Sequence, residues 1–227
     1  MGLLEHLNEV NHVRIFSVHD PEFRTYGRVV TGFDFSGAFS YMEKHTDIPA
    51  SGNIYVPSVK EMEDLRIRRQ IEASFYAGME CQFGYCNGRN TTYNGFEYHK
   101  GSEINAAVTD FMLVLGHKWD IRENHYSFDD ACVFFVEKGT VIEMYSTTLH
   151  LSPCRTSDAG FRCIVILPKG TNSDLTEEEL AMKNTGDPET VLLLKRNKWV
   201  IAHPDREPLI RQGAWAGITG ENRELYY

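Results

Sequence analysis

The chain has 227 residues, of which 42% are hydrophobic and 24% are charged, values typical of a folded globular protein and not of a disordered one. Its formal net charge of −9 argues against nucleic-acid binding and against docking on an anionic membrane, because both need clustered basic residues. We therefore expect a small-molecule substrate, with no nucleic-acid partner and no membrane partner.

The chain carries no signal for export or membrane insertion. Its most apolar run, Phe111 to Leu115, is only as long as a strand, and the N-terminus lacks a basic segment followed by an apolar core. These features predict a cytoplasmic protein. Five cysteines, an odd number at no metal-like spacing, are expected to stay reduced.

The first 54 residues are expected to form an N-terminal arm of mixed structure. Apolar and polar residues alternate over Asn11 to Val18, which predicts a strand, and Gly27 to Phe33 predicts another. Between Ser36 and Lys44 the pattern favours a short helix.

Residues 55–170 are expected to form the core of a β-barrel. Short runs of β-branched and aromatic residues alternate with turns rich in Gly, Asn and Asp, a spacing typical of sandwiches and barrels. The predicted strands are Ile71–Tyr76, Cys81–Asn87, Phe96–Lys100, Ile104–Leu115, Cys132–Val136, Val141–Tyr145, Thr147–Leu151 and Arg162–Leu167.

Residues 171–227 are expected to form a C-terminal helix and arm. Asp174 precedes Leu-Thr-Glu-Glu-Glu-Leu, which is typical of a capped helix start. Val191–Leu194 and Trp199–Ala202 predict strands, and the tail from Trp215 is rich in glycine and aromatic residues. Since no linker or repeat interrupts the chain, residues 1–227 are expected to form a single domain.

Four side chains form a candidate divalent-metal site. Glu97 and His99 lie two residues apart and share one face of a strand, and Glu103 follows a short turn. His150 ends a segment that begins at Gly139. Imidazole nitrogen and carboxylate oxygen without thiolate suit Zn, Mn, Fe, Ni or Co, and such a site is expected to keep a position open for substrate or water.

These spacings resemble the two motifs of the cupin family. Glu97-x-His99-x3-Glu103 is similar to the first motif, which usually begins with histidine, and Gly139-x10-His150 is similar to the second. The resemblance implies an all-β, jelly-roll barrel with a few short helices. By position it implies that His99, Glu103 and His150 are ligands, whereas Glu97 stands where the family usually has its first histidine.

A closer resemblance covers most of the chain. Three segments, beginning at Phe23, Glu97 and Leu149, resemble an uncharacterised bacterial cupin family, a domain of unknown function. The first of them, Phe23-Arg-Thr-Tyr-Gly-Arg-Val-Val, is also distantly similar to ureidoglycolate lyase. Membership of a cupin family implies the fold but no particular reaction.

The leading functional hypothesis is a metal-dependent isomerase or epimerase of a small sugar or sugar acid. The ion would stabilise an enediolate, and Glu103 or Glu143 would carry the proton between carbons. Glu143 is equally well read as an exposed acid of a half-buried strand.

Two other functional classes stay open at this point. One is another enzyme, either a ureidoglycolate-lyase-like C–N lyase or an iron oxygenase. The other is a sugar-binding cupin without activity, although no basic helix-turn-helix pattern accompanies the chain. Exposed sheet edges in such barrels predict a homodimer formed through the N-terminal strand or the aromatic tail.

Overall fold

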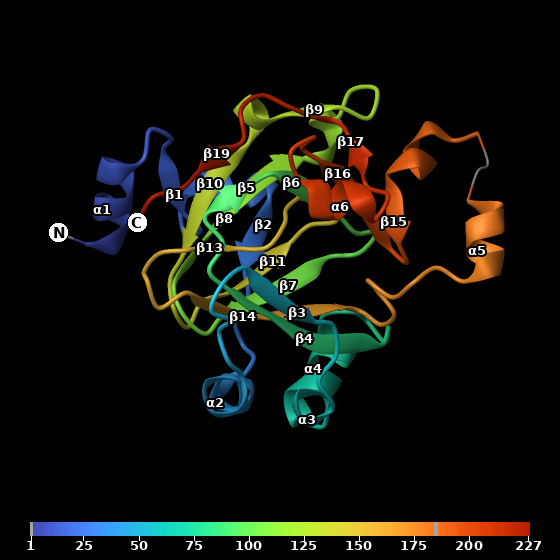
Figure 1. Cartoon of the computed structure of the whole chain (residues 1–227). Coiled ribbons are helices and arrows are strands. Elements are labelled where there is room, and N and C mark those ends of the chain that lie inside the picture. The colour runs from blue at the N-terminus through green and yellow to red at the C-terminus, as the bar shows by residue number, and fades with distance from the viewer. Residues whose placement is uncertain (1, 184–185) are drawn as a thin grey trace.

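The largest sheet is antiparallel throughout and has six strands (Figure 1). The computed structural model describes residues 2–183 and 186–227. From edge to edge the strands are β2 (Gly27–Val29), β11 (Val141–Met144), β7 (Glu103–Ala107), β14 (Phe161–Pro168), β4 (Cys81–Gly88) and β3 (Asn53–Val56).

A second sheet faces the first across a buried apolar layer. Phe111, Leu113 and Phe134 from this sheet pack against Ile142 and Cys163 of the six-stranded sheet. Its strands are β1 (Ile15–Ser17), β10 (Cys132–Val136), β8 (Phe111–His117) and β12 (Thr148–Leu149), with β13 (Cys154–Arg155) also paired to β8.

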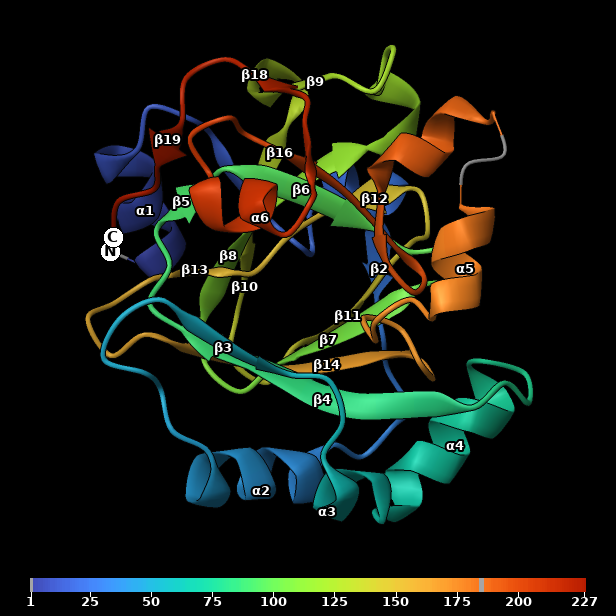
Figure 2. The ribbon, with the colours of Figure 1, turned by 45° about the vertical axis from the view of Figure 1, so that its right-hand side comes forward.

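Helices cover the outer face of the six-stranded sheet, as both ribbon views show (Figures 1 and 2). They are α2 (Ser36–His45), α3 (Lys60–Glu63) and α4 (Arg66–Ser74). Ile67 and Ile71, one helical turn apart on α4, are buried there with Ile104 and Ile164 of the sheet. The opposite face of this sheet is therefore the one that points into the fold.

The C-terminal part of the chain supplies most of a third sheet, which lies above β3, β4 and β14 in the view of Figure 2. Its central strand β16 pairs antiparallel with β6, a strand of the expected barrel core, so that Val200 lies opposite Glu97. The strands are β6 (Gly95–Tyr98), β15 (Leu193–Lys195), β16 (Lys198–Ala202) and β17 (Trp215–Ala216).

The remaining elements are short. Two small sheets pair β18 (Ile218–Thr219) with β9 (Tyr126–Ser127) and β19 (Arg223–Glu224) with β5 (Thr92–Tyr93). The other helices are α1 (Leu3–Val10), α5 (Glu177–Met182) and α6 (Glu207–Arg211), with 3-10 turns at Pro21–Thr25, Lys118–Asp120, Phe128–Asp130 and Pro188–Leu192. Near the two ends of the chain, Asn11 and Tyr226 exchange hydrogen bonds.

Two facing β-sheets with a few short helices confirm the expected all-β fold. Two strand predictions are wrong. Ile71–Tyr76 falls largely in α4, because Ile67 and Ile71 are spaced for a helix face. Ile104–Leu115 is broken at Val108–Asp110, so that β7 and β8 join different sheets.

Two further expectations concern cysteines and membranes. The five cysteines are all free, and four of them are buried. Within the described part of the chain, each helix is too short or too polar to cross a lipid bilayer.

The close approach of β4 to the chain after β3 gives a test of the packing. A Cβ on Gly84 would overlap the carbonyl oxygen of Val56 and lie 2.6 Å from the carbonyl carbon of Pro57, both rigid backbone. We expect Gly84→Ala to lower the free energy of unfolding by about 1–3 kcal/mol in denaturant titrations. Gly37→Ala on α2 is the matched control, since its Cβ would make only ordinary contacts with Leu65. Equal stability of the two variants would contradict this packing.

Candidate metal centre

Glu97, His99 and His150 are brought together by backbone pairing at the end of β6. The amide of Glu97 donates to the carbonyl of His150 at 2.6 Å, and the amide of His150 donates back at 3.0 Å. Alternation along the strand puts Glu97 and His99 on one face. Two residues 53 positions apart in sequence are thus held side by side by main-chain hydrogen bonds.

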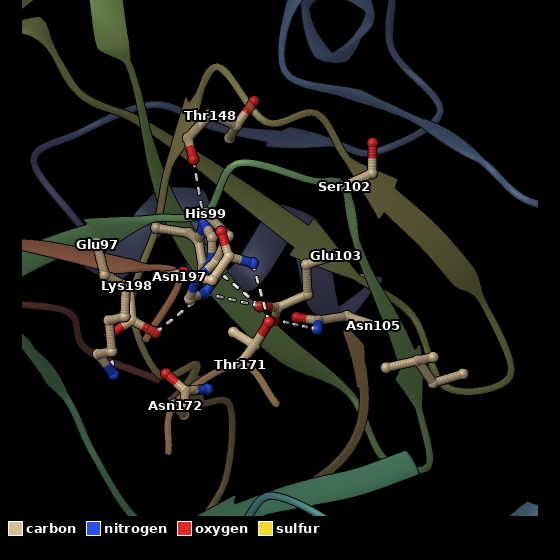
Figure 3. A network of polar contacts seen from close by, with 12 residues as sticks. Glu97, His99, Ser102, Glu103, Asn105, Thr148, Thr171, Asn172, Asn197 and Lys198 are labelled. Carbon is tan, nitrogen blue, oxygen red and sulfur yellow. Dashed lines mark hydrogen bonds and ion pairs between the residues drawn. The ribbon is translucent and has the colours of Figure 1, made fainter. Parts of the chain in front are cut away.

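Glu103 reaches the same place from the other side, because it is the first residue of β7 in the six-stranded sheet (Figure 3). Its Oε2 lies 3.2 Å from Nε2 of His150 and 3.4 Å from Nε2 of His99. The Oε1 of Glu97 lies 3.7 Å from Nε2 of His99. The two carboxylates therefore approach the imidazoles from two different sheets.

Both imidazoles are oriented by backbone carbonyls. Nδ1 of His99 lies 2.6 Å from the carbonyl oxygen of Asn197, and Nδ1 of His150 lies 3.0 Å from that of Thr148. A carbonyl oxygen can only accept, so each Nδ1 must carry a proton. In the neutral ring the lone pair then sits on Nε2, as it does in histidines that bind metals.

The Nε2 atoms consequently point at acceptors. A neutral imidazole lone pair and a carboxylate oxygen repel each other at these distances unless a proton or a metal ion lies between them. Nε2 of His99 is buried and has no hydrogen-bond partner among the described residues. One ligand atom each from Glu97, His99 and His150 lie within 4.8 Å of one another, a group that could hold a metal ion. The donor set of nitrogen and oxygen fits a divalent transition metal.

Each carboxylate has its own polar support. The side-chain amide of Asn105 donates to Oε1 of Glu103 at 2.7 Å, which leaves Oε2 turned toward the histidines. Nζ of Lys198 lies 2.5 Å from Oε2 of Glu97, so a cation already neutralises part of that charge. Such contacts orient ligands and set how strongly they bind an ion.

The pKa values follow from burial and from these neighbours. Burial alone would raise the pKa of Glu97, but Lys198, His99 and His150 outweigh it and lower the pKa to about 2. Burial likewise opposes the shift at Glu103, whose pKa is held well below its usual range by the two histidines. Burial would lower the pKa of His99, yet the two carboxylates raise it to about 9. Without metal the centre therefore keeps both acids ionised and a proton on His99.

A cavity of about 200 Å³ opens onto this centre. Besides the carboxylates and His150, polar side chains from distant parts of the chain line it, among them Tyr55, Asn172 and Arg206. Cys86, Leu151, Pro153, Val165 and Leu209 supply apolar wall. A cavity of this size suits a small-molecule ligand.

Four of the five expected site residues thus lie together, and Glu143 does not. In the sheet Glu143 pairs with Ile104, which is buried under the helices, so its side chain leaves the face opposite Glu103. There it forms an ion pair of 2.6 Å with Arg28 of β2. The expectation that Glu143 faces the cavity is wrong, because successive side chains of a strand point to opposite faces of the sheet.

Four polar residues of the centre were not predicted from the sequence. Asn105 and Lys198 hold the carboxylates, Asn197 holds His99, and Arg206 lines the cavity. Asn105 lies two residues after Glu103 and so shares its strand face, and this spacing could have identified it from the sequence. The other three belong to the C-terminal arm, and no local pattern shows that β16 pairs with β6.

Comparison with solved structures gives only partial and remote likenesses. An oxalate decarboxylase of Bacillus subtilis, in a study of its Mn(II) centers, has 13% identity and a TM-score of 0.31, covering 58% of this chain and 36% of that one. A salicylate 1,2-dioxygenase from Pseudoaminobacter salicylatoxidans in complex with gentisate has 9% identity and a TM-score of 0.29, covering 56% and 28%. This chain therefore spans about a third of the length of these two proteins.

A smaller solved protein is similar over a shorter stretch. The cupin-2 domain containing protein from Shewanella frigidimarina has 12% identity and a TM-score of 0.27, covering 39% of this chain and 71% of that one. No curated protein matches this chain in sequence.

The sequence profile of one family matches residues 15–223, which include the centre, the cavity wall and the C-terminal strands that complete both. With nearly the whole chain matched, the protein belongs to the family described as a domain of unknown function (DUF4867).

Proposed function

We propose that the protein is a metal-dependent isomerase or epimerase that acts on a small sugar or sugar acid. The observation that supports this most is the pair of histidines whose Nδ1 atoms are tied to backbone carbonyls while their Nε2 atoms converge on two carboxylates. This donor set would hold a divalent ion at the end of a small cavity, where a substrate can reach it.

The ion, held by Glu97, His99 and His150, would polarise a carbonyl oxygen of the substrate and so acidify the neighbouring C–H bond. Glu103 is the residue we assign to proton transfer, since it lines the cavity and Asn105 fixes its Oε1. Its Oε2 would take the proton from one carbon and return it to the neighbouring carbon on the same side of the substrate. Glu143 has no part in this proposal.

Lys198 would keep Glu97 ionised and limit the total negative charge around the ion. Its Nζ contacts only one of the two oxygens, so the other, Oε1, stays turned toward His99. Because Lys198 neutralises part of the charge of Glu97, the centre would bind the ion less tightly. The ion would then keep more of its affinity for an oxygen of the substrate.

A cytoplasmic homodimer belongs to the same proposal. The aromatic tail and the N-terminal strand pair within the chain, through β19 with β5 and β1 with β10. β1 is the edge of its sheet, but Asn8 already bonds both backbone groups of Ile15 on the outer side and Asp20 bonds those of Ser17, so a partner subunit would contact side chains there and would not add a strand.

Metal content provides the first test. We expect His99→Ala and His150→Ala each to lower the metal retained after loading and dialysis by about tenfold or more, because each removes one donor. His203→Ala is the matched control, since this buried histidine accepts from the amide of Asp205 and contacts the carbonyl of Gly220. Mass spectrometry of the bound metals is the measurement, and retention by both site variants equal to that of the control would refute the centre.

Replacement of the lysine beside Glu97 is expected to change the metal affinity in the opposite direction. Lys198→Met removes a cation 2.5 Å from a ligand oxygen, so the metal should bind about tenfold more tightly. The metal-free variant should melt at a lower temperature, because Glu97 is then buried without its partner. Lys118→Met, which breaks a comparable ion pair with Glu189 away from the centre, should leave metal affinity unchanged. Calorimetric metal titration checks the sign, and weaker binding by Lys198→Met would contradict it.

Proton exchange tests the reaction itself. Metal-loaded protein in D2O should introduce deuterium next to the carbonyl of at least one member of a panel of aldoses, ketoses and uronates, observed by NMR. Glu103→Gln should slow this exchange by about 100-fold or more, the usual contribution of a general base. Glu143→Gln should not slow it. No exchange with any member would refute the isomerase, and release of glyoxylate and urea from ureidoglycolate, or oxygen uptake with Fe(II), would favour the other enzyme classes.

A further inference from the structure

One cation in the cavity wall has no partner for part of its hydrogen-bonding capacity. Arg206 follows β16 and precedes α6, and its side chain lines the cavity that opens onto the metal centre. Nη1 donates to Oδ1 of Asn94 at 2.7 Å, which fixes the plane of the guanidinium. Nε is buried and has no hydrogen-bond partner within residues 2–183 and 186–227. The edge formed by Nε–H and Nη2–H is the one that binds a carboxylate with two parallel hydrogen bonds.

The charge of Arg206 is also uncompensated. Of the acids that the structure describes, none forms an ion pair with it, and the carboxylate of the neighbouring Asp205 lies 3.5 Å from Nδ1 of His203 instead. Burial lowers the pKa of Arg206, and no carboxylate opposes that shift. A buried cation without a counter-ion costs free energy, and proteins keep one mainly where a ligand supplies the opposite charge.

The metal centre does not supply that charge. A divalent ion would be balanced by Glu97 and Glu103, and Lys198 then adds a further positive charge beside Glu97. With Arg206, the loaded cavity carries a surplus of positive charge. A neutral sugar would leave this surplus in place, whereas an anion would remove part of it.

A second unpaired group bears on the rest of the ligand. Asn172 also lines the cavity, and its Nδ2 donates to the hydroxyl of Tyr55 at 2.7 Å. Its Oδ1 is buried and has no partner among the described residues. This oxygen is an acceptor, so it calls for a donor such as a hydroxyl group.

We propose that the cavity selects a small polyhydroxy acid, whose carboxylate binds the Nε–H and Nη2–H edge of Arg206 and whose hydroxyl donates to Oδ1 of Asn172. Its other end would reach the metal centre, and this last part rests on the function proposed above. The acid, not the neutral sugar, is then the substrate class. Arg206 is a specificity residue that takes no part in proton transfer.

The test compares acids with neutral molecules of matched size on the full-length, metal-loaded protein. D-Glucuronate is paired with D-glucose, and D-glycerate with glycerol, in thermal-shift and calorimetric titrations. We expect the acid of at least one pair to bind about tenfold or more tightly than its neutral partner, because two charge-assisted hydrogen bonds are gained. In Arg206→Met that preference should disappear while the metal content stays at the wild-type level.

A second variant serves if Arg206→Met does not fold. Asn94→Asp nearly preserves shape and gives Arg206 an internal carboxylate at the position of its present partner, so the preference for acids should fall by about tenfold or more. Equal binding of acid and neutral molecule in both pairs would overturn the proposal, as would an acid preference that survives both substitutions. Neither result depends on turnover, so a lack of deuterium exchange would count against the isomerase alone.

Discussion

The centre depends on one constraint, the tethering of two imidazole Nδ1 atoms to backbone carbonyl oxygens. Because those oxygens can only accept, the Nε2 lone pairs of His99 and His150 are directed at the carboxylate of Glu103. A buried cluster of acceptors is unstable without a positive charge among them. The main-chain geometry therefore requires a positive charge at this point, which is the proton on His99 in the metal-free centre and would be the ion in the proposed one.

The C-terminal strand β16 adds the remaining parts of the centre. Its pairing with β6 puts Lys198 on the same face as Glu97, and the turn before it brings the carbonyl of Asn197 to His99. The turn after it carries Arg206. A segment expected to be an arm thus supplies the groups that tune the ion, orient one ligand and bind the substrate in our proposal.

Much of the fold could be predicted from sequence, because strand-length apolar runs such as Cys132–Val136 coincide with the strands that form. The metal cluster was also within reach, since residue type and spacing place Glu97, His99, Glu103 and His150 in one pattern. The errors have physical causes. Side chains alternate between the two faces of a strand, so the face on which Glu143 lies depends on which residue it pairs with. Its partner is Ile104, and this pairing cannot be read from the sequence. Lys198 and Arg206 could not be predicted either, because they reach the centre through the pairing of β16 with β6, two segments far apart in sequence. That residues 1–227 form a single domain stays a prediction.

The tether between His99 and Asn197 also sets the order in which the protein can mature. The two residues are 98 positions apart, so the carbonyl that orients the imidazole leaves the ribosome long after the ligand itself. Until then His99 lacks the acceptor that fixes which of its ring nitrogens carries the proton, whereas the acceptor for His150 is the carbonyl of Thr148, only two residues away. Under the proposed function, selective metal uptake would therefore need the turn between β15 and β16 in place, which comes late in synthesis and folding.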